Sequence, residues 1–291
     1  MPDAMIDPPR LATLGEIAHN YDAVLCDVWG VVHNGRMAFA EAVEALQRFR
    51  AEHGPVILIT NAPRPQEYVT RLFPGLGVMP DSYDAVVSSG DAARFALEGF
   101  APGPVYQIGP DFDDPLYEGI ELEFTEKAGS SAVVCCTGLR HLPDDEPTNY
   151  HAELEELSDL GVPMICANPD IVFRFGDKLV WAAGSLAQIY EQLGGRVIRP
   201  GKPDGAIYDL AFTKLEELEG RKPDRTRVLA IGDGPATDVK GAMREDLDCM
   251  FIGGGIHGDA FEDPEDFIRS AHAILTNEEA EAAYAAPALL W

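Results

Sequence analysis

Six side chains of this sequence share one kind of position: each follows a short apolar run or lies in the turn beyond one, where a buried strand would end. They are Asp27, Thr60, Asn61, Lys202, Asp233 and Asp238. A carboxylate at such a point can act as a nucleophile, bind a metal ion or simply cap a loop. Together, the six residue types fit phosphoryl transfer. One carboxylate would attack phosphorus, the hydroxyl, amide and ammonium groups would hold phosphate oxygens, and the other carboxylates would bind Mg²⁺.

Each of these signals is weak when it is taken singly. A lone Thr at a strand end usually serves as a cap, and a lone Lys-Pro dipeptide, as at Lys202, usually forms a surface turn. The segment Gly-Asp-Gly-Pro-Ala-Thr-Asp that carries Asp233 and Asp238 is stronger. The four strand-end signals are Asp27, Thr60 with Asn61, Lys202, and Asp233 with Asp238, and their combination in one chain favours the catalytic interpretation over four independent caps.

The segments that must position these residues predict a parallel α/β fold. Apolar runs at residues 23–26 and 56–59 indicate strands, and between them Val43, Leu46 and Phe49 have helical spacing. A strand, a helix and a strand within about 40 residues form a βαβ unit, so the two strands run parallel. Asp27 and Thr60 should therefore lie side by side at the carboxyl edge of one sheet, where α/β folds place their ligands.

A second α/β segment interrupts this pattern. Residues 99–104 (Gly-Phe-Ala-Pro-Gly-Pro) have the composition of a linker, and apolar runs at residues 105–109, 132–136 and 163–167 follow it. We therefore expect two domains, a core formed by residues 1–98 and 183–291 and an inserted domain formed by residues 99–182.

The carboxy-terminal part of the chain predicts further elements of the core. A helix is expected at residues 205–219 and strands at residues 227–232 and 249–252. The short apolar run at residues 273–275 suggests the last strand, and the alanine-rich residues 280–288 suggest a terminal helix.

Composition excludes some classes of partner. The 291 residues include 49 acidic and 22 basic side chains, a formal net charge of -27. Nucleic-acid backbones and anionic membrane surfaces should repel such a chain. No apolar run approaches the ~20 residues of a membrane span, and the amino terminus lacks the pattern of a signal peptide. The five cysteines lie mostly in apolar runs without metal-ligand spacing, which is typical of reduced thiols in a cytoplasmic protein.

In these motifs the sequence resembles the haloacid dehalogenase (HAD) superfamily, within its type IIA branch of sugar, nucleotide and p-nitrophenyl phosphatases. The resemblance extends from Tyr21 to about Leu275. It implies a Rossmann-like core with a parallel sheet, an inserted α/β cap of the C2 type and a phosphoric monoester hydrolase activity. It also implies a Mg²⁺ cofactor, an aspartyl-phosphate intermediate, a small phosphorylated metabolite as substrate and a possible homodimer formed through the caps.

The resemblance further implies a role for each motif residue. Asp27 matches the nucleophile, and Lys202 matches the catalytic lysine that neutralises both nucleophile and phosphate. Thr60 and Asn61, together with Lys202, match the phosphate-binding groups.

Two further sets of roles follow from the same resemblance. The segment Ala-Asn-Pro-Asp at residues 167–170 matches the loop that determines substrate specificity, through Asn168 and Asp170. The implied metal site consists of the carboxylate of Asp27, the main-chain carbonyl of Trp29, Asp233 and Asp238.

Trp29 is a departure from the superfamily pattern, in which phosphatases usually carry a second Asp two residues after the nucleophile. That Asp protonates the leaving group and activates water, and an indole can do neither at neutral pH. The alternative function is therefore a phosphate-ester-binding or regulatory protein with little turnover. A related hydrolase, such as one that cleaves C–P bonds, is a third reading, whereas a metal-free dehalogenase is disfavoured by Asp233 and Asp238.

Three explanations could reconcile Trp29 with catalysis. His33 could donate the missing proton, although a His in such a loop is more often an ordinary polar residue. Trp29 could instead form a packing or stacking surface that selects the substrate. Finally, the substrate could have a leaving group that departs without help, such as a phenol or an acyl phosphate.

Overall fold

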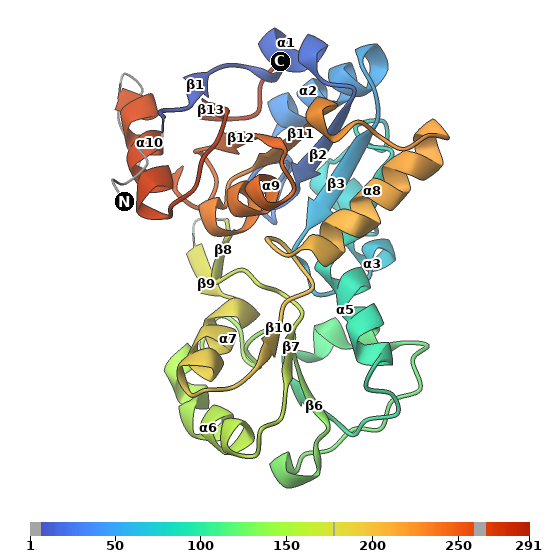
Figure 1. Cartoon of the computed structure of the whole chain (residues 1–291), viewed down its shortest axis with the longest axis vertical. Helices are drawn as coiled ribbons and strands as arrows, with labels where there is room; N and C mark the ends of the chain where they lie inside the picture. The colour runs from blue at the N-terminus through green and yellow to red at the C-terminus, as the bar shows by residue number, and fades with distance from the viewer. Residues whose placement is uncertain (1–6, 177, 259–265) are drawn as a thin grey trace.

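The larger lobe contains a seven-stranded parallel sheet, in the order β1-β13-β12-β11-β2-β3-β4 (Figure 1). The computed structural model describes residues 7–176, 178–258 and 266–291. The strands are β1 (Arg10–Leu11), β13 (Tyr284–Ala286), β12 (Asp248–Ile252), β11 (Val228–Gly232), β2 (Ala23–Asp27), β3 (Val56–Thr60) and β4 (Ala85–Ser88). The central strands β11, β2 and β3 are buried along their whole lengths, which fits their nearly continuous apolar sequences.

Helices cover both faces of this sheet because successive side chains of each strand point to opposite sides. Val24 and Cys26 of β2 pack with one group of helices, whereas Ala23 and Leu25 pack with the other. The first group includes α1 (Leu14–Ile17), α2 (Ala40–Glu52), α3 (Gln66–Thr70) and α4 (Phe73–Leu76). The second includes α8 (Gly205–Glu219), α9 (Lys240–Arg244) and α10 (Phe267–Asn277).

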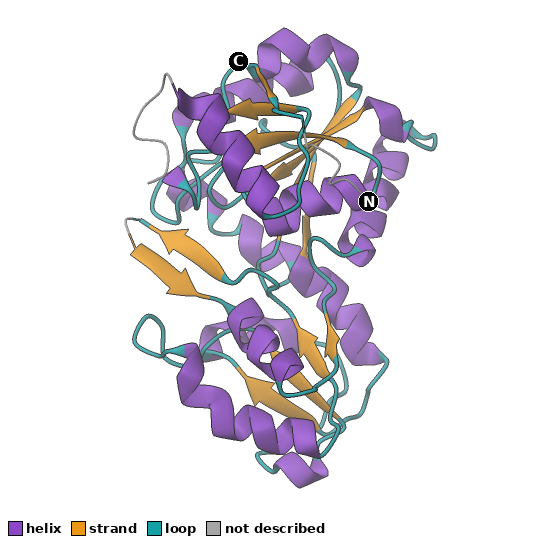
Figure 2. Cartoon of the chain, turned by 60° about the vertical axis from the view of Figure 1, so that its left-hand side comes forward, coloured by secondary structure: helices purple, strands orange, loops and turns teal. Residues whose placement is uncertain are grey.

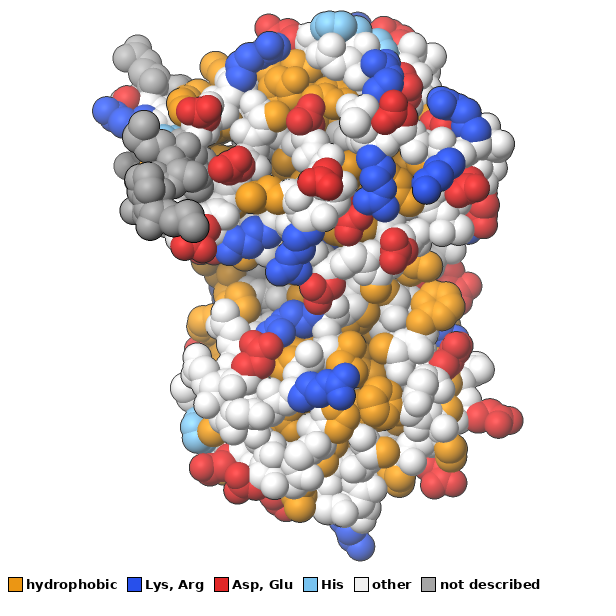
Figure 3. All heavy atoms as spheres, viewed as in Figure 1, with side chains coloured by type: hydrophobic (Ala, Val, Ile, Leu, Met, Phe, Trp, Pro, Cys, Tyr) orange, Lys and Arg blue, Asp and Glu red, His pale blue; other side chains and the backbone are white. Residues whose placement is uncertain are grey.

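The smaller lobe contains a four-stranded parallel sheet, in the order β10-β7-β6-β5. Its strands are β5 (Val105–Ile108), β6 (Val133–Cys136), β7 (Met164–Cys166) and β10 (Val197–Ile198). Helices α6 (His151–Asp159) and α7 (Ala183–Gln192) cover one face, and α5 (Ser89–Glu98) packs on the other. Figure 3 shows a narrower waist between the two lobes on the face in view. The expected α/β fold, a Rossmann-like core with an α/β cap, is confirmed.

An antiparallel hairpin lies between the lobes in both ribbon views (Figures 1 and 2). It consists of β8 (Val172–Phe175) and β9 (Lys178–Trp181). Immediately after it, α7 and β10 belong to the small lobe, since β10 pairs with β7. The small lobe thus uses residues beyond 182, the end expected for the insertion, and we propose that the cap ends near residue 198.

Two expected elements at the carboxy-terminal end are wrong. Residues 273–275 belong to helix α10, whose buried residues Phe267, Ala271 and Leu275 recur every fourth position. The alanine-rich end forms strand β13, which pairs with β12 and β1, so tertiary pairing overrides the helical preference of alanine. Among the described residues, no helix is both long and apolar enough to cross a membrane.

Gly54 provides a test of how closely the turn before β3 packs on β2. An ideal Cβ atom at Gly54 would lie 1.9 Å from the carbonyl oxygen of Asp22, so the main chain would have to shift. We expect Gly54→Ala to lower the free energy of unfolding by about 1–3 kcal/mol in urea titration. Gly75→Ala is the control, because a Cβ there meets no atom within 4 Å, and it should leave stability unchanged or raise it. Equal losses in both variants would contradict the predicted clash.

Candidate active site

A cavity of about 520 Å³ lies between the two lobes, at the carboxyl ends of β2, β3 and β11. All the residues expected to form the site line it, from both lobes. They are Asp27, Trp29, Thr60, Asn61, Asn168, Asp170, Lys202, Asp233 and Asp238. The fold therefore brings together side chains that are as many as 211 positions apart in the sequence.

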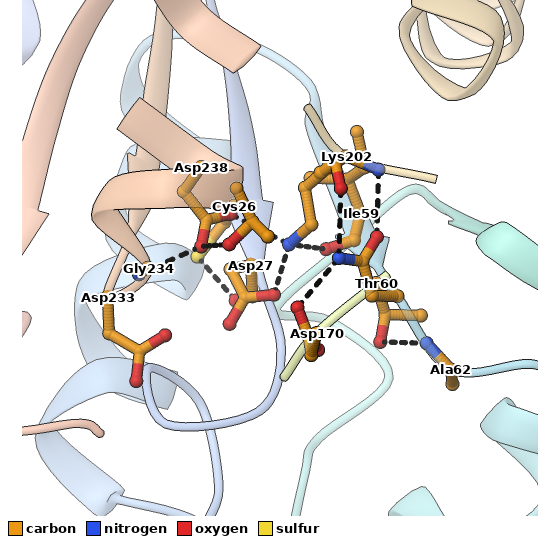
Figure 4. Close-up of polar contacts among 12 residues, drawn as sticks. Cys26, Asp27, Ile59, Thr60, Ala62, Asp170, Lys202, Asp233, Gly234 and Asp238 are labelled. Atoms are coloured by element: carbon orange, nitrogen blue, oxygen red, sulfur yellow. Dashed lines mark hydrogen bonds and ion pairs between the residues drawn. The ribbon is translucent and has the colours of Figure 1, made fainter. Parts of the chain in front are cut away.

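The ammonium group of Lys202 lies between two carboxylates in the interior of the site (Figure 4). It donates to Oδ1 of Asp27, to Oδ1 of Asp238 at 2.7 Å and to the main-chain oxygen of Ile59 at 3.2 Å. Burial alone would lower the pKa of Lys202, but the charges of Asp238 and Asp27 raise it well above its usual value. Lys202 therefore stays cationic and holds the two carboxylates in place.

Asp233 completes a cluster of three buried carboxylates with Asp27 and Asp238. One oxygen of each lies within 4.8 Å of the others, a spacing that could accommodate a metal ion. The Oδ2 atom of Asp233 accepts a hydrogen bond from the amide of Ile256 at 2.7 Å. Burial, and then the charge of Asp238, raise the pKa of Asp233 to about 8. A cluster of three acids with one lysine would thus hold an uncompensated negative charge when fully ionised, which a divalent cation would neutralise.

Local backbone geometry holds these carboxylates at the sheet edge. Gly30 turns the chain away from the end of β2 with a φ of +90°, and a Cβ there would lie 2.1 Å from Oδ2 of Asp233. The position thus requires glycine both for its conformation and for the close approach of Asp233. Asp238 lies in a short π-helical segment, Pro235–Val239, and its Oδ2 accepts from the amide of Gly234 at 3.0 Å.

Thr60 and Asn61 lie at the end of β3, the neighbour of β2. Asn61 is buried and connects three parts of the chain: its Oδ1 accepts from the amide of Lys202 at 2.8 Å, and its Nδ2 donates to Oδ1 of Asp170 at 2.8 Å. Asp170 is contributed by the small lobe, so this amide joins the two lobes at the cavity. The Thr60 hydroxyl accepts from the amide of Ala62 at 3.2 Å.

Trp29 lies at the cavity wall, but its side chain connects the lobes. Its indole N–H donates to the main-chain oxygen of Arg174 in the hairpin. Its ring contacts Phe173 edge-on, with centroids 5.2 Å apart, and lies 6.2 Å from Phe175. Nearby, the amide of Gly176 donates to the carbonyl of Asn34 at 3.0 Å. Trp29 therefore packs against the hairpin of the small lobe, and its expected role as a surface that selects the substrate stays a prediction.

His33 does not occupy a position from which it could serve the site. It is buried between the rings of Trp29 and Phe73, and it is absent from the described lining of the cavity. Its Nδ1 accepts from the amide of Gly35 at 3.1 Å, and burial lowers its pKa to about 4. The neutral imidazole is a packing group, so the substitute proton donor has to be sought elsewhere.

Several lining residues were missed by sequence reasoning. They are Arg36, Arg64, Phe112, Asp113, Phe173, Phe175, Lys178 and Trp181. Arg64 of the large lobe pairs with Asp113 of the small lobe at 3.3 Å. The alternation Phe-Arg-Phe at residues 173–175, followed by Gly176, is a hairpin signal that could have identified the aromatic wall. The Arg64–Asp113 pair had no such signal, because it depends on how the lobes meet.

The comparisons with known proteins agree with this fold and site. Residues 24–122 match the family model described as haloacid dehalogenase-like hydrolase, and residues 199–277 match a second model of HAD-like hydrolases. A solved hydrolase of the haloacid dehalogenase-like family from Brucella suis 1330 is 43% identical. It covers 88% of this chain and 92% of its own, with a TM-score of 0.81.

Two more distant relatives are named for the reactions that they catalyse. An acid sugar phosphatase from Staphylococcus saprophyticus is 22% identical over 253 residues, which are 81% of this chain and 88% of that protein. A glycerol phosphate phosphatase from Mycobacterium tuberculosis, solved in complex with magnesium, is 23% identical with a TM-score of 0.64. It covers 96% of this chain and 78% of its own.

The parallel core sheet, its inserted cap and the carboxylate cluster between them define a hydrolase of the HAD type. The chain belongs to the haloacid dehalogenase-like hydrolase family. The assignment to this superfamily made from the sequence is thereby confirmed.

The hydrogen bond from Trp29 to Arg174 predicts that the indole N–H stabilises the hairpin against the large lobe. Trp29→Phe keeps a ring but removes the donor, and such a bond contributes about 0.5–1.5 kcal/mol. We expect amide hydrogen exchange in β8 and at Gly176 to accelerate by several-fold. Trp181→Phe is the control, since that indole donates to Glu146 within the small lobe. Unchanged exchange in Trp29→Phe, or equal acceleration in both variants, would contradict this prediction.

Proposed function

We propose that this protein is a Mg²⁺-dependent phosphatase that hydrolyses a small phosphate monoester through an aspartyl phosphate on Asp27. The observation that carries the proposal is the buried ammonium of Lys202, which pairs with Asp27 at the carboxyl end of β2. Burial raises the pKa of Asp27 well above its usual value, and the charge of Lys202 opposes that rise and so favours the ionised nucleophile. The names of the relatives, an acid sugar phosphatase and a 5'-nucleotidase among them, support a phosphomonoester as substrate.

The residues of the site fit each requirement of this reaction. An oxygen of Asp27 would attack phosphorus while Lys202, the Thr60 hydroxyl and the Asn61 segment bind phosphate oxygens. The P–O bond to the leaving group breaks as the bond to Asp27 forms, and water then hydrolyses the acyl phosphate. Asn168 and Asp170 of the small lobe line the same cavity and would select the leaving group.

The carboxylate cluster fits a divalent cation. Its donors are oxygens, which Mg²⁺ prefers, and three acids against one lysine leave a negative charge to be balanced. We propose that Asp27, the carbonyl of Trp29, Asp233 and Asp238 hold or support this cation. When bound, Mg²⁺ supplies charge neutralisation for an anionic substrate in a strongly acidic protein.

One observation favours a second candidate function, a phosphate-ester-binding or regulatory protein with little turnover. The indole N–H of Trp29 is already donated to Arg174, so position 29 offers no proton to a leaving group. Tight binding of phosphate esters without their hydrolysis would support this candidate.

Replacement of the nucleophile tests the proposed reaction. We expect Asp27→Asn to lower kcat for p-nitrophenyl phosphate by at least about 10³-fold, because the amide cannot form the acyl phosphate. Rapid acid quench of the unaltered protein with ³²P-labelled acetyl phosphate should trap label on the protein, and the variant should trap none. Asp159→Asn, a change of the same type on the exposed side of α6, should retain activity and labelling. Full activity in Asp27→Asn would exclude this mechanism.

The raised pKa of Asp233 predicts how stability depends on pH and on the cation. A carboxyl group with a pKa near 8 in the folded state binds more protons than it does when unfolded, so cation-free stability should fall as pH rises from about 4 to 8. Mg²⁺ requires the ionised cluster and should therefore raise Tm more at pH 8 than at pH 6. Differential scanning fluorimetry measures both effects.

Asp233→Asn is the matching variant for this measurement. It removes a buried charge, so the cation-free protein should gain stability at pH 8 and lose the shift caused by Mg²⁺. Asp159→Asn should respond to Mg²⁺ as the unaltered protein does. A Mg²⁺ shift that persists in Asp233→Asn would place the cation elsewhere.

A further inference from the structure

The proton for the leaving group has no donor at position 29. The indole N–H of Trp29 is donated to Arg174, and the ring is packed against Phe173. A leaving group such as an alkoxide is too basic to depart as an anion at a useful rate, so it requires an acid within hydrogen-bond reach. This acid must come from another residue that lines the cavity.

The described lining of the cavity contains five acidic side chains. They are Asp27, Asp113, Asp170, Asp233 and Asp238. Three of these form the buried cluster at the sheet edge, where they would act as nucleophile and cation ligands. Asp113 is engaged in an ion pair with Arg64 at 3.3 Å, although burial raises its pKa to about 6 against the charge of that partner. Asp170 is the remaining acid.

Asp170 projects from the small lobe toward the Lys202–Asp27 pair, beside the expected phosphate-binding residues (Figure 4). Its Oδ1 accepts from Nδ2 of Asn61 at 2.8 Å. Its Oδ2 has no hydrogen-bond partner among the described residues, in a side chain that lines the cavity. One oxygen is thus positioned by the core, and the other is free to carry a proton.

The main chain around Asp170 is held firmly enough for such a role. Its amide donates to Oδ1 of Asn168 at 3.2 Å, and its carbonyl accepts from the amide of Gly184 at 3.0 Å. Gly184 lies in the first turn of helix α7, and a Cβ there would lie 2.4 Å from the carbonyl oxygen of Asp170. The loop is therefore packed directly against the helix and presents the carboxyl group from a fixed point.

We propose that Asp170 is the catalytic acid of this site and protonates the leaving-group oxygen from the cap, in place of the residue that Trp29 displaces. This inference rests on the proposed phosphatase function. Burial raises the pKa of Asp170 to about 6, although Lys202 and Asn61 oppose the rise. The carboxyl group therefore remains partly protonated near neutral pH, as a general acid should.

The step balances without any further reactant. An oxygen of Asp27 forms a bond to phosphorus while the bond between phosphorus and the leaving-group oxygen breaks. The proton on Oδ2 of Asp170 moves to that leaving-group oxygen at the same time. The products are an alcohol, an aspartyl phosphate and an ionised Asp170. When water attacks the aspartyl phosphate, inorganic phosphate and free Asp27 form, and the released proton returns to Asp170.

Two esters with the same ring test the proposal. p-Nitrophenol leaves readily as an anion, whereas phenol is a much weaker acid and its ester needs protonation more. The first turnover of p-nitrophenyl phosphate and of phenyl phosphate is measured with enzyme in excess of substrate and Mg²⁺ present. We expect Asp170→Asn to lower the rate for phenyl phosphate by about 10²–10⁴-fold and the rate for p-nitrophenyl phosphate by less than about tenfold.

Two variants accompany this measurement. Asp170→Glu restores a carboxyl group and should recover part of the rate for phenyl phosphate. Asp113→Asn alters the other acid of the small lobe and should change the two rates by the same factor. The thermal shift caused by Mg²⁺ serves as the folding control for each variant.

The outcomes separate this proposal from the function on which it rests. Equal losses on both esters in Asp170→Asn, or no loss on phenyl phosphate, would overturn the acid role and leave the phosphatase assignment intact. If the unaltered protein hydrolyses neither ester, the proposed function falls and this inference falls with it.

Discussion

The ion pair of Lys202 with Asp27 and Asp238 is the interaction on which the rest of the site depends. Burying any one of these three charged groups alone would cost free energy. The three are stable together because the ammonium group lies between the two carboxylates. The loss of one partner would leave an uncompensated buried charge, at a cost of about 3–5 kcal/mol. The sheet topology makes the pair possible, since β11 and β2 are neighbours and Asp238 lies in the short helical segment that follows β11. The order of strands therefore determines the chemistry at their ends.

The loop after β2 contributes both to the carboxylate cluster and to the contact between the two lobes. Gly30 turns the main chain beside Asp233, and Trp29 extends to the hairpin of the small lobe. Position 29, where phosphatases of the superfamily usually carry an Asp for proton transfer, thus holds a side chain that connects the lobes and forms part of the cavity wall. Since Asn61 also reaches Asp170, the two lobes meet through contacts that are themselves part of the site. Movement of the cap would consequently alter both the shape of the cavity and its acid–base groups.

The electrostatics of the cavity differ from those of the molecule. The chain carries a net charge of -27, yet basic side chains from both lobes line the cavity: Arg36, Arg64, Lys178 and Lys202. Acidic and basic groups are interspersed over the face shown in Figure 3. Five acidic side chains also line the cavity, so a bound divalent cation would be needed to make it positive and to attract an anionic ester that the protein as a whole would repel. The aromatic wall of Phe173, Phe175 and Trp181 is suited to the less polar part of such an ester.

The sequence alone determined the parallel α/β core, its inserted second sheet and the set of polar residues at the strand ends. These features follow from local apolar runs, helical spacing and turn residues, which are properties of neighbouring positions. It was wrong about residues 273–275 and the alanine-rich end, because strand β13 exists only through its pairing with β12 and β1. Only the tertiary structure decided that Trp29 donates to the hairpin, that His33 packs between Trp29 and Phe73, and that Asp170 reaches Asn61. The physical reason is that these contacts join residues of different lobes or layers, whose distances no local pattern encodes.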